Sequence, residues 1–99
     1  MSVTISNING KISAVIAGKA DVNFSEEMKQ AFDAQIPDGS QVEIEAADLE
    51  YIASSALRVF LSLYKRMDAT GGSVTFLNVK PTVMQIFKLT GFDTFAKFE

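Results

Sequence analysis

A strand pattern runs without pause into a helix pattern between Val42 and Val59, and this junction constrains the fold more than any other feature. Residues 41–46 alternate polar and apolar side chains, which is the period of a strand with one buried face. From Ser54 onward, apolar residues recur every three or four positions, as in an amphipathic helix. The junction therefore predicts a strand–helix unit with Ser54 and Ser55 at the start of the helix. A helix start exposes backbone N–H groups and a partial positive charge, which favour a phosphate.

Shorter signals before and after this junction predict the other elements. Asn9-Gly10 separates two β-branched segments and is typical of a two-residue hairpin turn. Asn23, with Glu26 three positions later, resembles a capping box at the start of a helix, and Gly91 fits the left-handed position after the last helix. The expected strands are residues 3–6, 12–17, 41–46 and 74–79, the expected helices are 23–36, 54–70 and 81–90, and residues 92–99 are either a short strand or one helical turn.

This order of elements predicts the fold class. Strands that alternate with helices require right-handed crossovers and a mostly parallel sheet, and the first two strands add an antiparallel hairpin. We therefore expect one α/β domain over residues 1–99, in which a mixed β-sheet packs against helices. The strand at 12–17 is apolar almost throughout, which is typical of a strand covered on both faces.

The residue types that are missing exclude several kinds of site. The chain has no Cys and no His, so thiolate chemistry, Ser-His-Asp catalysis and most zinc sites are excluded. A net charge of −3 argues against nucleic-acid binding, which needs clustered Lys and Arg. No apolar segment approaches the roughly 20 residues that cross a membrane, and no signal-peptide pattern is present. We expect a cytoplasmic protein that is not an enzyme, binds no metal or cofactor and inserts into no membrane.

Four segments resemble the STAS domain of bacterial anti-sigma factor antagonists. Residues 53–58 read Ala-Ser-Ser-Ala-Leu-Arg, where that family usually has Asp-Ser-Ser/Thr-Gly-Leu-Gly. Residues 18–21 read Gly-Lys-Ala-Asp in place of Gly-Glu-Leu-Asp, and residues 45–47 read Glu-Ala-Ala in place of Asp-Leu-Ser. Residues 89–92 read Leu-Thr-Gly-Phe, close to Leu-Thr-Gly-Leu. The order and spacing of the four segments extend the resemblance over nearly the whole chain.

The resemblance implies a non-enzymatic switch. Members of this kind bind an anti-sigma factor, often a serine kinase that carries ATP itself, and phosphorylation of the first Ser of the motif ends the association. Carried over by position, the phosphorylated residue is Ser54. The residues expected around it on the partner-binding end are Asp21, Ala53, Ser55, Leu57 and Arg58. Related STAS proteins imply an alternative, in which the chain is a constitutive subunit docked on a transport ATPase or another regulatory partner.

The residues alone leave each of these roles open. On the residues alone, a plain N-cap of the helix is the favoured explanation of Ser54 or Ser55, and Ser55 is interpreted mainly as structural. Asp21 is also explained as an ordinary turn residue. The resemblance is imperfect at Ala53, where the family has Asp, and at Ala56 and Arg58, where it has Gly. Two further charged sets are interpreted as solvated faces, namely the acidic Glu43, Glu45, Asp48 and Glu50 and the basic Arg58, Lys65 and Arg66.

Overall fold

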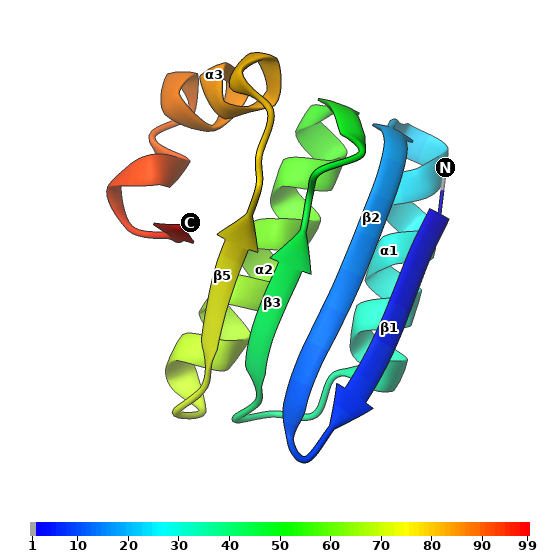
Figure 1. The fold of residues 1–99 in the computed structure, drawn as a ribbon, viewed down its shortest axis with the longest axis vertical. Coiled ribbons are helices and arrows are strands. Elements are labelled where there is room, and N and C mark those ends of the chain that lie inside the picture. Colours follow the sequence, from blue (N-terminus) through cyan, green and yellow to red (C-terminus); the bar gives the residue numbers. More distant parts are fainter. Residues whose placement is uncertain (1) are drawn as a thin grey trace.

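A computed structural model describes residues 2–99, and it places one sheet against helices on a single face (Figure 1). The two longer helices lie side by side behind the sheet, and the third lies beyond the end toward which the parallel strands point. The elements in chain order are β1 (Ser2–Ile8), β2 (Lys11–Ala20), α1 (Val22–Gln35), β3 (Gln41–Glu45), β4 (Leu49–Ile52), α2 (Ser54–Ala69), β5 (Ser73–Leu77), α3 (Pro81–Leu89), the 3-10 helix η1 (Phe92–Thr94) and β6 (Lys97–Phe98).

The sheet is mixed, as the order of elements predicts. Its strands follow the order β1-β2-β3-β5-β6, and β4 pairs with β2 outside this path. β1 and β2 are antiparallel, and every other pair is parallel. The hairpin turn is also confirmed, because Asn9 and Gly10 both have positive φ (54° and 85°), as a type I′ turn requires.

The core lies between the sheet and the helices, and its centre is aromatic. The ring of Phe60, from α2, lies 5.4 Å from that of Phe76 on β5 in an edge-to-face arrangement. It also lies 6.3 Å from the rings of Phe32 on α1 and Phe87 on α3. All four side chains are buried, so this cluster joins α1, α2 and α3 to the sheet.

The prediction that residues 12–17 are covered on both faces is wrong. Ile12, Ala14 and Ile16 are fully buried, whereas Val15 is 38% exposed. Because α1 and α2 lie on the same side of the sheet (Figure 1), the other face of β2 meets solvent. The side chains on that face are small or β-branched, and for this reason the sequence reads as continuously apolar.

The expected direct passage from strand to helix is also wrong, because a second strand intervenes. β3 ends at Glu45, and β4 follows before α2 begins at Ser54. β2 has ten residues and β3 only five, so the end of β2 extends beyond β3 and pairs with β4 instead. Pairing with β3 ends at Val15 and pairing with β4 begins at Gly18, and a register shift within the second pairing follows between Gly18 and Lys19.

The start of α1 differs from the expected one. α1 begins at Val22 with Asp21 as its N-cap, so the capping box proposed for Asn23 is wrong. Asp21 caps the helix because its Oδ1 accepts a 2.9 Å hydrogen bond from the N–H of Phe24. The N–H of Phe24 is thereby satisfied without a contribution from Asn23. At the other end of the chain, Gly91 has φ 76° as expected.

The last residues form both of the structures that the sequence left open, one helical turn and a short strand. The one-turn helix η1 precedes the short strand β6.

Candidate functional site

The starts of α1 and α2 lie next to one another at the carboxyl end of the sheet. Asp21 follows β2 directly and Ala53 follows β4 directly. Because β2 and β4 are parallel neighbours, both residues leave the sheet at the same edge. The N–H of Ala53 donates a 2.8 Å hydrogen bond to the carbonyl oxygen of Ala20, which holds the two helix starts together.

Ser54 is the first residue of α2 and its side chain is exposed. Ala53 occupies the N-cap position, and it has no side-chain atom that can cap the helix. The interpretation of Ser54 or Ser55 as the N-cap is therefore wrong. Within residues 2–99, the Ser54 hydroxyl has no intramolecular hydrogen-bond partner. The site thus combines an uncapped helix N-terminus with a free hydroxyl at its first residue.

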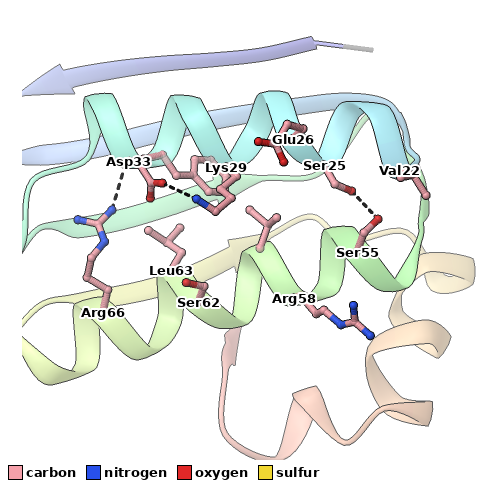
Figure 2. Close-up of a pocket in the computed structure, with 12 residues that line it drawn as sticks. Val22, Ser25, Glu26, Lys29, Asp33, Ser55, Arg58, Ser62, Leu63 and Arg66 are labelled. Carbon is pink, nitrogen blue, oxygen red and sulfur yellow. Dashed lines mark hydrogen bonds and ion pairs between the residues drawn. The ribbon is translucent and has the colours of Figure 1, made fainter.

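Ser55 differs from Ser54 because it is hydrogen-bonded across the two helices (Figure 2). Its Oγ lies 2.9 Å from the Oγ of Ser25 on α1. The Ser25 hydroxyl donates its hydrogen to the carbonyl oxygen of Asp21 at 2.7 Å. Since a hydroxyl has one hydrogen, Ser25 must accept from Ser55. The chain Ser55–Ser25–Asp21 therefore links the first turn of α2 to the cap of α1.

Sequence reasoning missed Ser25. It is 4% exposed and lies on the buried side of α1 next to Phe24 and Met28. A small polar residue beside the apolar stripe of a helix is the signal that could have found it, because a buried hydroxyl needs a partner.

A groove of about 310 Å³ runs from this serine pair along the space between α1 and α2 (Figure 2). Phe32 and Leu63 contribute buried apolar surface to it. Both helices contribute polar side chains along its length: Ser25, Glu26, Lys29 and Asp33 come from α1, and Ser55, Arg58, Ser62 and Arg66 come from α2.

The charges along the groove are partly neutralised by ion pairs. Lys29 and Asp33 are 3.1 Å apart, and this hydrogen bond, together with the carboxylate charge, raises the pKa of Lys29. Arg66 pairs with Asp38 at 2.9 Å. Among the described residues, Arg58 has no ion-pair partner within reach, so its charge is available near the start of α2.

The structure therefore brings together most of the expected site residues. Asp21, Ala53 and Ser54 lie at the paired helix starts, and Ser55 and Arg58 line the groove. Leu57 is on another side of α2, where it is half-buried against the core.

Other charged residues have local structural partners. Glu43 pairs with Lys11 at 3.3 Å, and Glu45 accepts hydrogen bonds from the N–H of Ala47 and the amide of Asn78. Within residues 2–99, no three His, Cys, Asp or Glu side chains gather in a way that could hold a metal ion. The helices of this described part are all too short or too polar to cross a bilayer.

A mixed sheet with its two longer helices on one face, and a serine as the first residue of α2, place the chain in the class of small α/β domains. A family model described as "Mlab, STAS domain" matches residues 6–97, which is nearly the whole chain. The protein belongs to the STAS domain family, as the four sequence segments suggest.

The chain is also similar to individual members of the family. It is 29% identical over 93 residues to BtrV of Bordetella bronchiseptica, a proposed anti-sigma factor antagonist, and the match covers 93% of this chain and 80% of BtrV. It is 25% identical over 91 residues to the anti-sigma-B factor antagonist of Bacillus subtilis, with 92% and 84% covered.

Solved structures share the fold. The anti-sigma factor antagonist SpoIIAA in its unphosphorylated form superposes with a TM-score of 0.75 at 14% identity, with 99% of this chain and 87% of SpoIIAA covered. The phosphorylated form of the Bacillus SpoIIAA superposes with a TM-score of 0.73 at 16% identity, with 99% and 91% covered.

Proposed function

We propose that this chain is an anti-sigma factor antagonist that binds a kinase-type anti-sigma factor and loses that partner when Ser54 is phosphorylated. The observation that carries the proposal is the exposed, unpartnered hydroxyl of Ser54 at the uncapped start of α2. Two relatives that match nearly the whole chain support the first part of the proposal, since one is described as an anti-sigma-B factor antagonist and the other as a proposed anti-sigma factor antagonist. The ATP belongs to the partner, so the chain itself acts by binding and needs no cofactor.

The geometry favours Ser54 over Ser55 as the phosphorylated residue. A kinase must reach the hydroxyl oxygen, and Ser54 is exposed whereas Ser55 is half-buried. Modification of Ser55 would also remove its 2.9 Å hydrogen bond to Ser25. A phosphate at Ser54 breaks no hydrogen bond within the described chain.

The free chain should tolerate that phosphate well. It would add a charge of about −1.5 to −2 at a helix end whose dipole favours an anion by about 0.3–1 kcal/mol. Ala53 leaves the backbone N–H groups of this end uncapped, so phosphate oxygens can accept from them. Arg58 lies one turn further along α2 without an ion pair and adds positive charge.

In the complex the same phosphate is unfavourable, because a partner that covers Ser54 must desolvate or repel it. A 10- to 1000-fold loss of affinity requires only about 1.4–4 kcal/mol. A switch of this size needs no change of fold. The proposed contact surface is centred on Ser54 and includes Asp21, Ala53, Ser55, Leu57 and Arg58.

Affinity capture from a lysate of the source organism tests the proposal, with wild type, Ser54→Ala and Ser54→Asp as parallel baits. Wild type and Ser54→Ala should capture a kinase-like anti-sigma factor, and Ser54→Asp should lose it. The matched control is Thr82→Asp, which adds the same charge to an exposed position in the first turn of α3 and should retain the partner. The purified kinase should phosphorylate wild type but not Ser54→Ala. Equal capture by all four baits would contradict the proposed switch.

One observation favours the second candidate, a constitutive subunit on a transport ATPase. Ala53 replaces the acidic residue that usually precedes the serine, and Arg58 replaces a glycine, so a phosphorylating enzyme would meet a different surface. In that case every bait, including Ser54→Asp, should capture the same transporter ATPase.

A further inference from the structure

β1 forms one edge of the sheet, and nothing in its sequence protects that edge. The strand covers seven residues, Ser2–Ile8, and pairs in continuous register with β2 on one side only. An edge strand presents a row of unpaired backbone N–H and C=O groups, which natural proteins protect with charges, prolines, bulges or short strands. β1 contains no charged residue and no proline, and its pairing with β2 has no register shift.

The other exposed strands of the same sheet are protected in these ways. At the opposite edge, β6 consists of Lys97 and Phe98 only, so it is both short and charged. β4 has four residues and includes the exposed Glu50. Within residues 2–99, β1 is therefore the long and uncharged edge strand of a sheet whose other edge strands are short and carry a charged residue.

The side chains of β1 are also incompletely covered. Val3 and Ile5 lie opposite the fully buried Ile16 and Ala14 of β2, on the helix side of the sheet, yet both remain half-buried. Ile8, at the end of the strand, is 70% exposed. A strand added alongside β1 would pair the free backbone groups and cover this apolar surface at the same time.

We propose that β1 pairs antiparallel with β1 of a second copy, so that two chains form a two-fold dimer with one continuous sheet. The strand is complementary to itself in this arrangement. With Ile5 on the two-fold axis, Val3 lies opposite Asn7 of the other copy, and Thr4 lies opposite Ser6. No like charges meet across the paired strands, because β1 carries no charged residue.

The dimer leaves the candidate functional site free. Asp21, Ser54 and Arg58 lie on elements other than β1, so each copy can still bind a partner. This inference does not rest on the proposed function, and it stands if Ser54 is never phosphorylated. A strand–strand contact of this length is small, so we expect a dimer that dissociates on dilution.

Sedimentation velocity of the purified chain over a wide range of concentrations tests the dimer. Two variants carry like charges on the exposed side of β1, Thr4→Lys with Ser6→Lys and Thr4→Glu with Ser6→Glu. In the proposed register each charge faces a like charge of the second copy, so each variant alone should raise the dissociation constant about thirtyfold. An equimolar mixture of the two variants should form a heterodimer, because opposite charges then face one another.

The matched control is Ser73→Lys with Thr75→Lys, which places the same two charges on the same face of the sheet, on the interior strand β5. This control should dimerise like wild type, and circular dichroism should show that all variants are folded. The proposal is overturned if wild type stays monomeric at every concentration, which would leave the edge to a strand of a different protein. It is equally overturned if both charged variants dimerise as wild type does.

Discussion

The guanidinium of Arg66, on α2, donates a 2.7 Å hydrogen bond to the carbonyl oxygen of Ile36, the C-cap residue directly after α1. A second nitrogen donates to the carbonyl oxygen of Phe32 at 3.1 Å, and Asp38 accepts a third bond at 2.9 Å. The last turn of a helix has carbonyl groups without partners. One side chain of α2 therefore gives the Ile36 carbonyl its partner and adds a second donor to the Phe32 carbonyl, which already accepts from the N–H of Ile36. It joins the two helices at this end, as the serine pair does at their starts.

Replacing Arg66 by Met, which keeps most of the apolar stem, should lower the free energy of unfolding by about 2–3 kcal/mol. The reason is that two partly buried carbonyl groups lose a charged donor. Urea unfolding followed by circular dichroism measures the effect. Asp38→Asn is the control, since it removes only the ion pair to an exposed carboxylate and should cost about 0–1 kcal/mol. Equal effects of the two variants would show that the carbonyl bonds contribute nothing.

The hydroxyl pair of Ser25 and Ser55 should behave as one coupled unit. A double-mutant cycle with Ser25→Ala, Ser55→Ala and the double variant should give a coupling free energy of about 0.5–1.5 kcal/mol. Denaturant unfolding of the four proteins provides the numbers. Ser54→Ala is the matched control and should stay within about 0.5 kcal/mol of wild type. Strict additivity of the two single changes would mean that the hydrogen bond is not formed in solution.

Asp21→Ala should lower the free energy of unfolding by about 1 kcal/mol, because the N–H of Phe24 loses its acceptor. Asn23→Ala, two residues later in the same turn, should change it by less than about 0.5 kcal/mol. Thermal or urea unfolding of both variants measures the difference. A larger loss of unfolding free energy for Asn23→Ala than for Asp21→Ala would mean that Asn23 is the N-cap in solution, as the sequence pattern favours.

Gly72→Ala should destabilise the protein by about 3 kcal/mol. A Cβ atom at Gly72 would lie 2.3 Å from the carbonyl oxygen of Ser40, and backbone atoms cannot move away cheaply. Gly71→Ala is the neighbouring control. Its Cβ would meet open space, but φ is 84° there, so we expect a smaller loss of about 1 kcal/mol. The reverse ranking in urea unfolding would contradict the close approach at Gly72.

Features set by local chemistry could be predicted from the sequence. The turn at Asn9 and Gly10 requires two residues with positive φ, and these two residue types accept that conformation at low cost. The left-handed conformation of Gly91 and the apolar stripes of α1 and α2 are predictable for the same reason, because residue type and local spacing alone determine them. The alternation of strands and helices then gives a mixed sheet without further information.

Features that depend on distant partners could not be predicted. β4 has no clear period, because only Leu49 and Ile52 are buried in it, and it forms because the end of β2 extends beyond β3. The pairing of Ser25 with Ser55 joins residues 30 positions apart. The family resemblance alone separates Ser54 from Ser55 in the sequence, whereas the physical difference between the two hydroxyls depends on that long-range hydrogen bond.

The ten-residue strand β2 also determines the order in which parts of the chain can form. The hairpin with β1 closes through a two-residue turn, and hairpins form in about 1–10 μs. The parallel pairs with β3 and β4 must wait until α1 and the following loop bring distant residues together, and such non-local contacts slow folding. β2 then has neighbours on both sides, β1 on one and β3 and β4 on the other. Its amide hydrogens should therefore exchange with solvent among the slowest in the protein, because their release requires these pairings to open.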